Sequence, residues 1–325
     1  FFQEGGRGIV PRSPMRAARA LQPLTRPAAT GGWWRARRAL HAHAQQAQLV
    51  SQGLPTFQVA AHQDTNIILR EGGAIPKLGL STFLTPPGEA TRGAVSHALS
   101  EGYRHIDTSE LFKNERDVGA AIQGSGVTRE DVFITTRYWH AGGATPVSAC
   151  RASMKRLGVD SVDAYLMYPP KGETLMLKVW EAMQGLEQAG LAKHVGLSLA
   201  TLSEVTAIVR AKLPIPRIIQ APVCPFSPQR ELLALCAELG VHVSSLSPLG
   251  GGLRLENTVV GGVARGLGAR PSQVMIAWGL RKGLSCVPKS SSAAHISENW
   301  GALGLELSEG DMHALDAIRP RPDVP

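Results

Sequence analysis

Short apolar runs alternate with amphipathic stretches from residue 66 onward, and this pattern predicts a repeating strand–helix fold. The strand-like runs cover residues 77–83, 103–107, 132–137, 163–167, 194–198, 217–221, 241–247 and 284–288. Amphipathic segments with helical spacing lie between them, at residues 89–102, 146–158, 175–190, 202–213 and 228–240. Strands that alternate with helices pair in parallel. The pattern therefore predicts a parallel sheet, either closed into a (β/α)8 TIM barrel or doubly wound.

Glycines mark the ends of these predicted elements. Residues 67–80 read as a short hairpin that turns at Glu71, Gly72 and Gly73, which would form an N-terminal cap. Four predicted helices end at a glycine, where a left-handed cap is expected: Gly102, Gly158, Gly190 and Gly240. No G-x-G-x-x-G turn follows the first strand, which argues against a doubly wound dinucleotide-binding sheet.

The positive charge of the chain is concentrated in its first 55 residues. The whole chain carries a net charge of +8. Residues 1–55 hold one acid, Glu4, and no lysine, but they hold eight arginines: Arg7, Arg12, Arg16, Arg19, Arg26, Arg35, Arg37 and Arg38. The remaining residues are nearly neutral, with 26 basic and 25 acidic side chains left from totals of 34 and 26. The body therefore lacks the excess of positive charge that is typical of a nucleic-acid-binding domain.

The first 55 residues have the composition of a mitochondrial targeting sequence, because they are rich in Arg and Ala and nearly free of acid. We expect a mitochondrial protein with a basic extension at 1–55 and a folded body at 56–325. Alternatively, the extension is kept as an anchor in an assembly. Its partner would then be a protein subunit of a large organellar complex or an anionic lipid surface, and less readily nucleic acid.

The sequence indicates neither a metal site nor a membrane-spanning segment. The four cysteines, Cys150, Cys224, Cys236 and Cys286, are widely spaced, and no pair has the short spacing of a zinc or redox motif. We therefore expect no metal site. No apolar run approaches the roughly 20 residues that cross a bilayer, so no transmembrane segment is expected.

Five blocks of the body resemble one enzyme family. They are GYRHIDTSELFKNERDVG (102–119), FITTRYW (133–139), LAKHVGLS (191–198), the long segment 218–250, and VPKSSSAAHISENW (287–300). In this order and spacing they resemble the aldo-keto reductases, over residues 66–318. The resemblance implies a (β/α)8 barrel that uses NADPH, with its site at the carboxyl ends of the strands.

The resemblance also implies four chemical positions. In the family a tyrosine gives a proton to the substrate carbonyl, a lysine lowers the pKa of that tyrosine, an aspartate holds the lysine, and a histidine orients the carbonyl. Here the aspartate is Asp107, but the tyrosine position is Phe112, the lysine position is Arg137 and the histidine position is Tyr168. Phe112 has no proton to give. Arg137 is expected to form a static ion pair with Asp107.

The expected cofactor positions are kept unevenly. At the nicotinamide end, the resemblance points to Thr82, Ser198 and Gln220, whereas Leu199 and Leu246 stand where an amide and an aromatic ring are usual. At the other end it points to Lys289, Ser290, His295, Glu298 and Asn299. His295 replaces an arginine that would pair with the 2′-phosphate, which weakens the preference for NADPH over NADH. Glu298 and Asn299 could equally be ordinary residues of a helix start.

Three changes among four chemical positions lead us to expect a non-catalytic accessory subunit of a mitochondrial assembly. A membrane respiratory complex is favoured over a mitoribosome. No working cofactor is expected in that case, although residual NADPH or NADH binding stays open. One alternative is an active NAD(P)H-dependent carbonyl oxidoreductase with a rebuilt site, in which Tyr168 is the acid and Arg137 lowers its pKa. Another is a module that senses the nucleotide without turnover.

Overall fold

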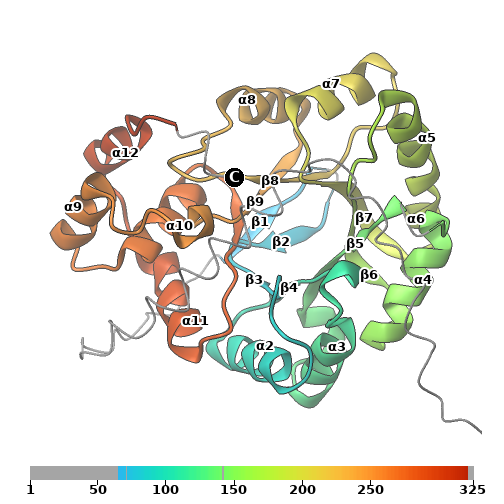
Figure 1. Cartoon of the computed structure of the whole chain (residues 1–325), viewed down its shortest axis with the longest axis horizontal. Coiled ribbons are helices and arrows are strands. Elements are labelled where there is room, and N and C mark those ends of the chain that lie inside the picture. The colour runs from blue at the N-terminus through green and yellow to red at the C-terminus, as the bar shows by residue number, and fades with distance from the viewer. Residues whose placement is uncertain (1–64, 71, 141–142, 321–325) are drawn as a thin grey trace, which may run out of the picture.

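The body is a closed barrel of eight parallel strands. The structure, a computed structural model of the chain, describes residues 65–70, 72–140 and 143–320. Neighbouring strands pair in parallel in the order of the sequence. They are β3 (Leu80–Ser81), β4 (His105–Asp107), β5 (Phe133–Tyr138), β6 (Val162–Met167), β7 (Ala192–Ser198), β8 (Ile218–Pro222), β9 (His242–Leu246) and β10 (Ser285–Val287). Figure 1 shows these strands in the middle of the molecule, surrounded by helices.

The first and last strands of this series meet and close the ring. Parallel bridges join Leu78 to Cys286 and Ser81 to Lys289. Backbone hydrogen bonds accompany them, from Gly79 N to Cys286 O at 2.9 Å and from Ser81 N to Pro288 O at 3.0 Å. A doubly wound sheet would leave two open edges. The prediction of a (β/α)8 barrel is therefore confirmed, and the doubly wound alternative is wrong.

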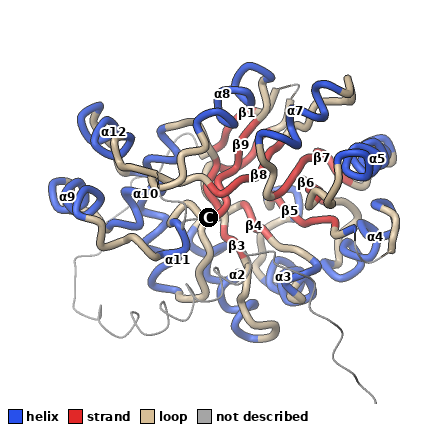
Figure 2. Tube along the Cα trace, turned by 45° about the horizontal axis from the view of Figure 1, so that its top comes forward, coloured by secondary structure: helices blue, strands red, loops and turns tan. Residues whose placement is uncertain are grey.

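Helices form the outer layer, as Figure 2 shows with strands in red and helices in blue. They are α2 (Glu89–Glu101), α3 (Glu115–Gly124), α4 (Pro146–Leu157), α5 (Glu173–Met183), α6 (Gly185–Gln188), α7 (Leu202–Arg210), α8 (Arg230–Leu239), α9 (Thr258–Gly266), α10 (Pro271–Arg281), α11 (Ala293–Trp300) and α12 (Glu309–Asp316). The glycines predicted to end helices, Gly102, Gly158, Gly190 and Gly240, all have positive φ. The segment 175–190, predicted as one helix, is instead divided between α5 and α6.

A two-stranded hairpin closes the amino-terminal end of the barrel, as predicted. Its strands β1 (Asn66–Ile68) and β2 (Ala74–Pro76) pair in antiparallel fashion. Ile75 lies in one buried cluster with Phe133, which is the first residue of β5. This end of the barrel is therefore covered, and the opposite end is left for a site. No helix in the described ranges combines the length and apolarity that a bilayer crossing requires.

The barrel interior holds two buried histidines that stay neutral. His105 Nε2 lies 2.9 Å from Thr135 Oγ1, and His242 Nε2 lies 2.9 Å from Ser285 Oγ. Burial lowers the pKa of each histidine to about 4, and for His242 the neighbouring His105 adds to the effect. In the unfolded chain both would titrate near 6.5. As the pH falls, these histidines therefore gain a proton at a higher pH in the unfolded chain than in the folded chain.

We expect the free energy of unfolding to fall as the pH drops from 6.5 towards 4. Over this range the unfolded chain binds protons at these histidines and the folded chain does not, so acid favours the unfolded chain. For His105, with a folded pKa of about 4, the loss by pH 5 is about 2 kcal/mol. Urea unfolding of wild type and of His105→Gln at pH 7.5 and pH 5 measures it. The variant should lose less stability between the two pH values. Equal losses in both proteins would contradict this account.

Candidate active site

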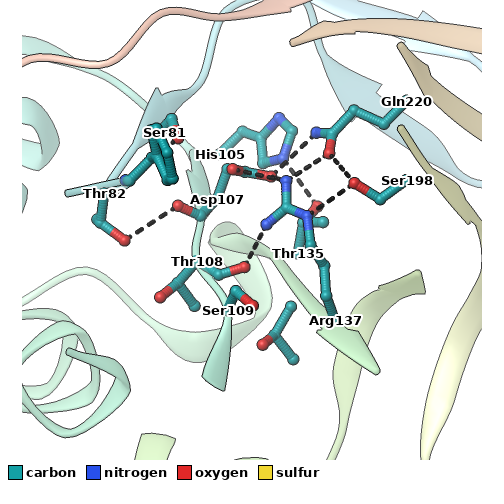
Figure 3. Close-up of polar contacts among 12 residues, drawn as sticks. Ser81, Thr82, His105, Asp107, Thr108, Ser109, Thr135, Arg137, Ser198 and Gln220 are labelled. Atoms are coloured by element: carbon teal, nitrogen blue, oxygen red, sulfur yellow. Dashed lines mark hydrogen bonds and ion pairs between the residues drawn. The ribbon is translucent and has the colours of Figure 1, made fainter. Parts of the chain in front are cut away.

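A buried cluster of polar side chains lies at the carboxyl ends of the barrel strands. Asp107 is the last residue of β4, Arg137 lies near the end of β5, and Ser198 ends β7. Gln220 lies on β8 and is paired in register with Ser198. All four side chains are almost completely removed from solvent. Figure 3 shows them converging on the Arg137 guanidinium. Parallel strands end at the same rim, so residues far apart in sequence meet here.

Arg137 forms the ion pair with Asp107 that the sequence predicts. Its Nη2 donates to both carboxylate oxygens of Asp107, at 2.7 and 2.9 Å. Its Nη1 donates to the backbone carbonyl of Thr108, and its Nε donates to Ser198 Oγ at 3.0 Å. Nη2 also donates to Gln220 Oε1. The guanidinium is thus held by partners from four places in the sequence.

The charge of Arg137 is stabilised in this setting. Burial disfavours the guanidinium charge, but the adjacent Asp107 carboxylate outweighs it, so the pKa of Arg137 lies above its ordinary value. A permanent positive charge therefore sits at the centre of the barrel mouth. It can stabilise a negative charge that develops next to it, but it cannot itself exchange a proton.

Ser198 and Gln220, predicted as cofactor contacts, are hydrogen-bonded to this ion pair. Ser198 Oγ donates to Gln220 Oε1 at 3.1 Å, and Gln220 Nε2 donates to Asp107 Oδ1 at 3.0 Å. Both side chains also accept a hydrogen bond from Arg137. Their contact with a cofactor stays a prediction.

Thr82 is also part of the scaffold. Its backbone N donates to Asp107 O at 2.9 Å, and its Oγ1 donates to the same carbonyl at 3.2 Å. The Asn114 amide then joins the loops after β3 and β4, because its Nδ2 donates to the carbonyls of Thr82 at 2.9 Å and Thr85 at 3.1 Å. Thr82 thereby fixes the loop that carries position 112.

Phe112 faces the guanidinium from that loop. It ends a short 3-10 helix (Glu110–Phe112) whose first turn is capped by Ser109, the Oγ of which accepts from Leu111 N at 3.2 Å. The Phe112 ring centroid lies 5.5 Å from Arg137 Cζ, and the Phe83 ring packs edge-on against it at 5.2 Å. The tyrosine position of the family is therefore filled by a ring without a hydroxyl group.

Tyr168 also lies close to this guanidinium. Its ring centroid is 5.9 Å from Arg137 Cζ. Burial raises the pKa of Tyr168, and the opposing effects of Arg137 and Ser109 do not overcome it. Arg137 does lower this pKa, as the sequence predicts, but burial has the larger effect and the net pKa lies above the ordinary value. Tyr168 keeps its proton at neutral pH.

A second group of predicted residues lies at the start of α11. Lys289 is half-buried, and burial lowers its pKa. Its Nζ lies 3.5 Å from Ser291 Oγ, and no carboxylate in the described part of the chain pairs with it. Ser290 donates to the Ser292 carbonyl at 3.2 Å, and Ser292 caps the helix. An unpaired cation beside a helix start suits a phosphate group.

Glu298 and Asn299 are not at this helix start. Both lie in the last turn of α11, so the alternative that they are ordinary helix-start residues is wrong. The Glu298 carboxylate accepts from Ser272 Oγ and lies 3.8 Å from Arg270 Nε, which ties α11 to α10. Asn299 is buried. His295 is exposed and lies in the first turn of α11, next to the Ser292 cap.

Comparison with known proteins decides the family. The model of the aldo/keto reductase family matches residues 78–320. The chain belongs to the aldo-keto reductase family. An aldo-keto reductase of Mycolicibacterium smegmatis is 36% identical over 255 residues, covering 78% of this chain and 92% of that protein.

Two further relatives extend the comparison. A glycerol 2-dehydrogenase (NADP(+)) of Saccharomyces cerevisiae is 35% identical, over 79% of this chain and 92% of that protein. The crystal structure of an aldo/keto reductase from Brucella melitensis matches with a TM-score of 0.73 and 31% identity. It covers 77% of this chain and 96% of that one.

These findings correct the expectation of a non-catalytic accessory subunit. The aldo-keto reductase relatives carry the names of reductases and dehydrogenases, which are oxidoreductases, and none is named as a subunit of an assembly. They favour the alternative of an active oxidoreductase with Tyr168 as the acid, which the sequence analysis ranked second to the loss of the donor at Phe112. In the structure, a buried phenol, Tyr168, lies beside the same guanidinium. The prediction for residues 1–55 lies outside the described residues.

Sequence reasoning missed several residues of this aldo-keto reductase site. Ser109 caps the short 3-10 helix that ends at Phe112, and Phe83 packs on Phe112. Trp139 follows β5 directly and lies edge-on to Tyr168 with 6.0 Å between ring centroids. Each of these residues immediately follows a strand or sits in the adjoining loop. A position just after a predicted strand could therefore have identified these residues as part of the site. The sequence could not show which residues each of them contacts.

Proposed function

We propose that the chain is an NAD(P)H-dependent oxidoreductase that reduces carbonyl compounds, with Tyr168 as the proton donor. The observation that carries the proposal is the position of the Tyr168 phenol beside the charged Arg137, at the carboxyl end of the barrel. Membership of a family of reductases supports it.

The residues of this chain fit the phosphate end of the nucleotide better than its nicotinamide end. Lys289, Ser290 and the start of α11 supply a cation, a hydroxyl group and free amides for a phosphate. Ser198 and Gln220 are hydrogen-bonded to Arg137, and their contact with the carboxamide stays a prediction. We therefore propose that Lys289 anchors the cofactor through its phosphates. His295 supplies no permanent charge there, so NADH should compete with NADPH.

The chain's own residues divide the work as follows. When bound, the nicotinamide would supply the hydride for the carbonyl carbon. Tyr168 holds the proton for the carbonyl oxygen, since its raised pKa keeps the phenol protonated at neutral pH. Arg137 stabilises the phenolate that remains after proton transfer. Water then returns a proton to Tyr168. Asp107 keeps Arg137 in place throughout.

Titration of the purified full chain with NADPH and NADH, followed by fluorescence, tests binding. Oxidation of the bound nucleotide with a panel of aldehydes and ketones, followed by absorbance, tests turnover. We expect binding of both nucleotides, weakened about tenfold or more by Lys289→Met because a charge-assisted phosphate contact is lost. Binding without turnover of any carbonyl compound would overturn the proposal.

A mitochondrial location remains a separate proposal. It rests on the composition of residues 1–55, which are rich in Arg and Ala and hold one acid. Fluorescence microscopy of the full chain and of a chain without residues 1–55, each fused to a fluorescent protein, would test it. Loss of mitochondrial signal in the shortened chain is expected. An unchanged distribution would overturn the proposal. A partner for this segment likewise remains a proposal.

A further inference from the structure

The hairpin that covers the amino-terminal end of the barrel exposes one isoleucine to water. Ile67 packs against the buried cluster that contains Ile75 and Phe133. Successive side chains of a strand point to opposite faces, so the next residue, Ile68, points away from the barrel. Its side chain is 76% exposed, the largest value for a large apolar residue in the described ranges. Ile215 lies in the loop between α7 and β8, at the same end, and is 37% exposed. Folding of the barrel therefore leaves apolar surface here in water.

The turn of this hairpin lies against the segments that lead into β7 and β9. Arg70, which is exposed, donates from Nη1 to the Leu239 carbonyl at 2.6 Å, just before β9. Gly73 lies so close to His194, the third residue of β7, that a side-chain carbon added to the glycine would be 2.9 Å from the imidazole Nε2. β8 lies between these two strands, and Figure 1 shows the hairpin in the middle of the ring. Ile68 and Arg70 therefore share one face of the molecule with the starts of β7, β8 and β9.

This face also carries positive charge. From the end of α6 to the start of β7, and from α7 to β8, the charged side chains are Lys193, Lys212 and Arg217. Lys193 Nζ lies 2.8 Å from Asp163 Oδ1, but the side chain of the lysine is 56% exposed and that of the aspartate is 5% exposed. Arg129 pairs with the same carboxylate at 2.7 Å. One buried acid thus pairs with two cations, and the excess positive charge lies on the side of the solvent.

Acidic side chains at this end lie mainly away from the hairpin. Three acids lie in the described loops that lead into the barrel strands, all before β5 or β6: Glu130, Asp131 and Asp160. Glu187, on α6, pairs with Arg217 at 3.3 Å. Residues 1–55, with eight arginines and one acid, precede β1 and are joined to the barrel through the hairpin. Positive charge and exposed apolar side chains therefore coincide around the hairpin and the starts of β7 and β8.

We propose that this face of the folded body docks onto an anionic lipid surface, with Ile68 in the headgroup layer and the neighbouring cations against lipid phosphates. The basic face, as we call it, consists of Ile68, Arg70, Lys193, Lys212 and Ile215. Each Lys or Arg near such a surface strengthens binding about fivefold, and an isoleucine gains by leaving water. A nucleic acid would use the charge but would leave both isoleucines in water. The carboxyl ends of the strands point away from the lipid, so the candidate active site stays open to substrate in water.

The test is co-sedimentation of the full chain with vesicles of phosphatidylcholine alone and of equal parts phosphatidylcholine and phosphatidylglycerol, at low ionic strength. The face variant combines Lys193→Gln with Lys212→Gln. Asp163 keeps Arg129 as its partner in this variant, so the barrel should fold. The matched control combines Lys113→Gln with Lys171→Gln, two exposed lysines in loops at the carboxyl end of the barrel. Every protein carries residues 1–55, so a difference between the variants reports on the folded body.

We expect wild type to sediment with the anionic vesicles and to stay in solution with phosphatidylcholine alone. The face variant should bind the anionic vesicles about tenfold more weakly or less, and the control should stay within about twofold of wild type. Ile68→Ser should weaken binding about fivefold, whereas Leu253→Ser, at the other end of the barrel, should not. No binding of wild type would overturn the inference. Equal binding of the face variant and the control would also overturn it, because residues 1–55 alone would then account for the binding. Thermal unfolding of each variant shows that it folds.

Discussion

Replacing Tyr168 by phenylalanine is expected to lower kcat for carbonyl reduction by a factor of about 10² to 10⁴, the usual cost of losing a general acid. The change removes one oxygen and keeps the ring that packs against Trp139 and faces Arg137. Folding should therefore survive. Steady-state rates with saturating nucleotide and substrate measure the effect, and the loss should appear in kcat more than in nucleotide binding.

Two matched variants sharpen this prediction. Tyr165 lies on β6, which ends just before Tyr168, and is fully buried in the hydrophobic core, so Tyr165→Phe makes the same chemical change away from the site. Its rate should stay close to that of wild type. Phe112→Tyr, added to Tyr168→Phe, places a phenol next to Arg137 from the loop after β4. The double variant should recover part of the lost rate. A wild-type rate in Tyr168→Phe would show that another group gives the proton.

Replacing Arg137 by methionine is expected to lower the free energy of unfolding by about 3–5 kcal/mol, because it leaves Asp107 charged, buried and without its main partner. The side chains of this pair are 1% and 0% exposed. Urea unfolding at pH 7.5 measures the loss. Replacing both members, by Arg137→Met and Asp107→Leu, should cost much less than the sum of the single changes.

An exposed ion pair provides the control for this prediction. Arg281 and Glu309 lie 2.7 Å apart, but their side chains are 55% and 87% exposed. Arg281→Ala should therefore cost less than about 1 kcal/mol. If Arg137→Met were equally mild, the Asp107–Arg137 pair would not be the structural centre of the site.

The fold could be predicted because its signals are local. Each strand and most helices follow from short runs of side-chain pattern, and the glycines after α2, α4, α6 and α8 mark left-handed ends that few other residues adopt. Closure of the ring depends on the pairing of β3 with β10, which no local pattern contains. The family resemblance supplied that step. The break between α5 and α6 was missed because the apolar spacing runs on through it.

The site was predicted less well because its chemistry depends on which side chains come into contact in the folded barrel. Position 137 was identified, and its ion pair with Asp107 follows from charge alone. The commitment of Ser198 and Gln220 to Arg137 does not, since it depends on the reach of one guanidinium across three strands. The net direction of the pKa shift of Tyr168 could not be predicted for a similar reason. Charge is visible in a sequence, whereas the burial that raises this pKa is a property of the packed barrel.

The central claim is that this barrel reduces carbonyl compounds with Tyr168 as the acid. The most direct measurement is the amount of alcohol formed from an aldehyde and NADPH, compared over time with the nucleotide consumed, in wild type and in Tyr168→Phe. The account predicts one alcohol per nucleotide in wild type and a rate at least about 100-fold lower in the variant. No alcohol from wild type, or equal rates in the two proteins, would contradict it.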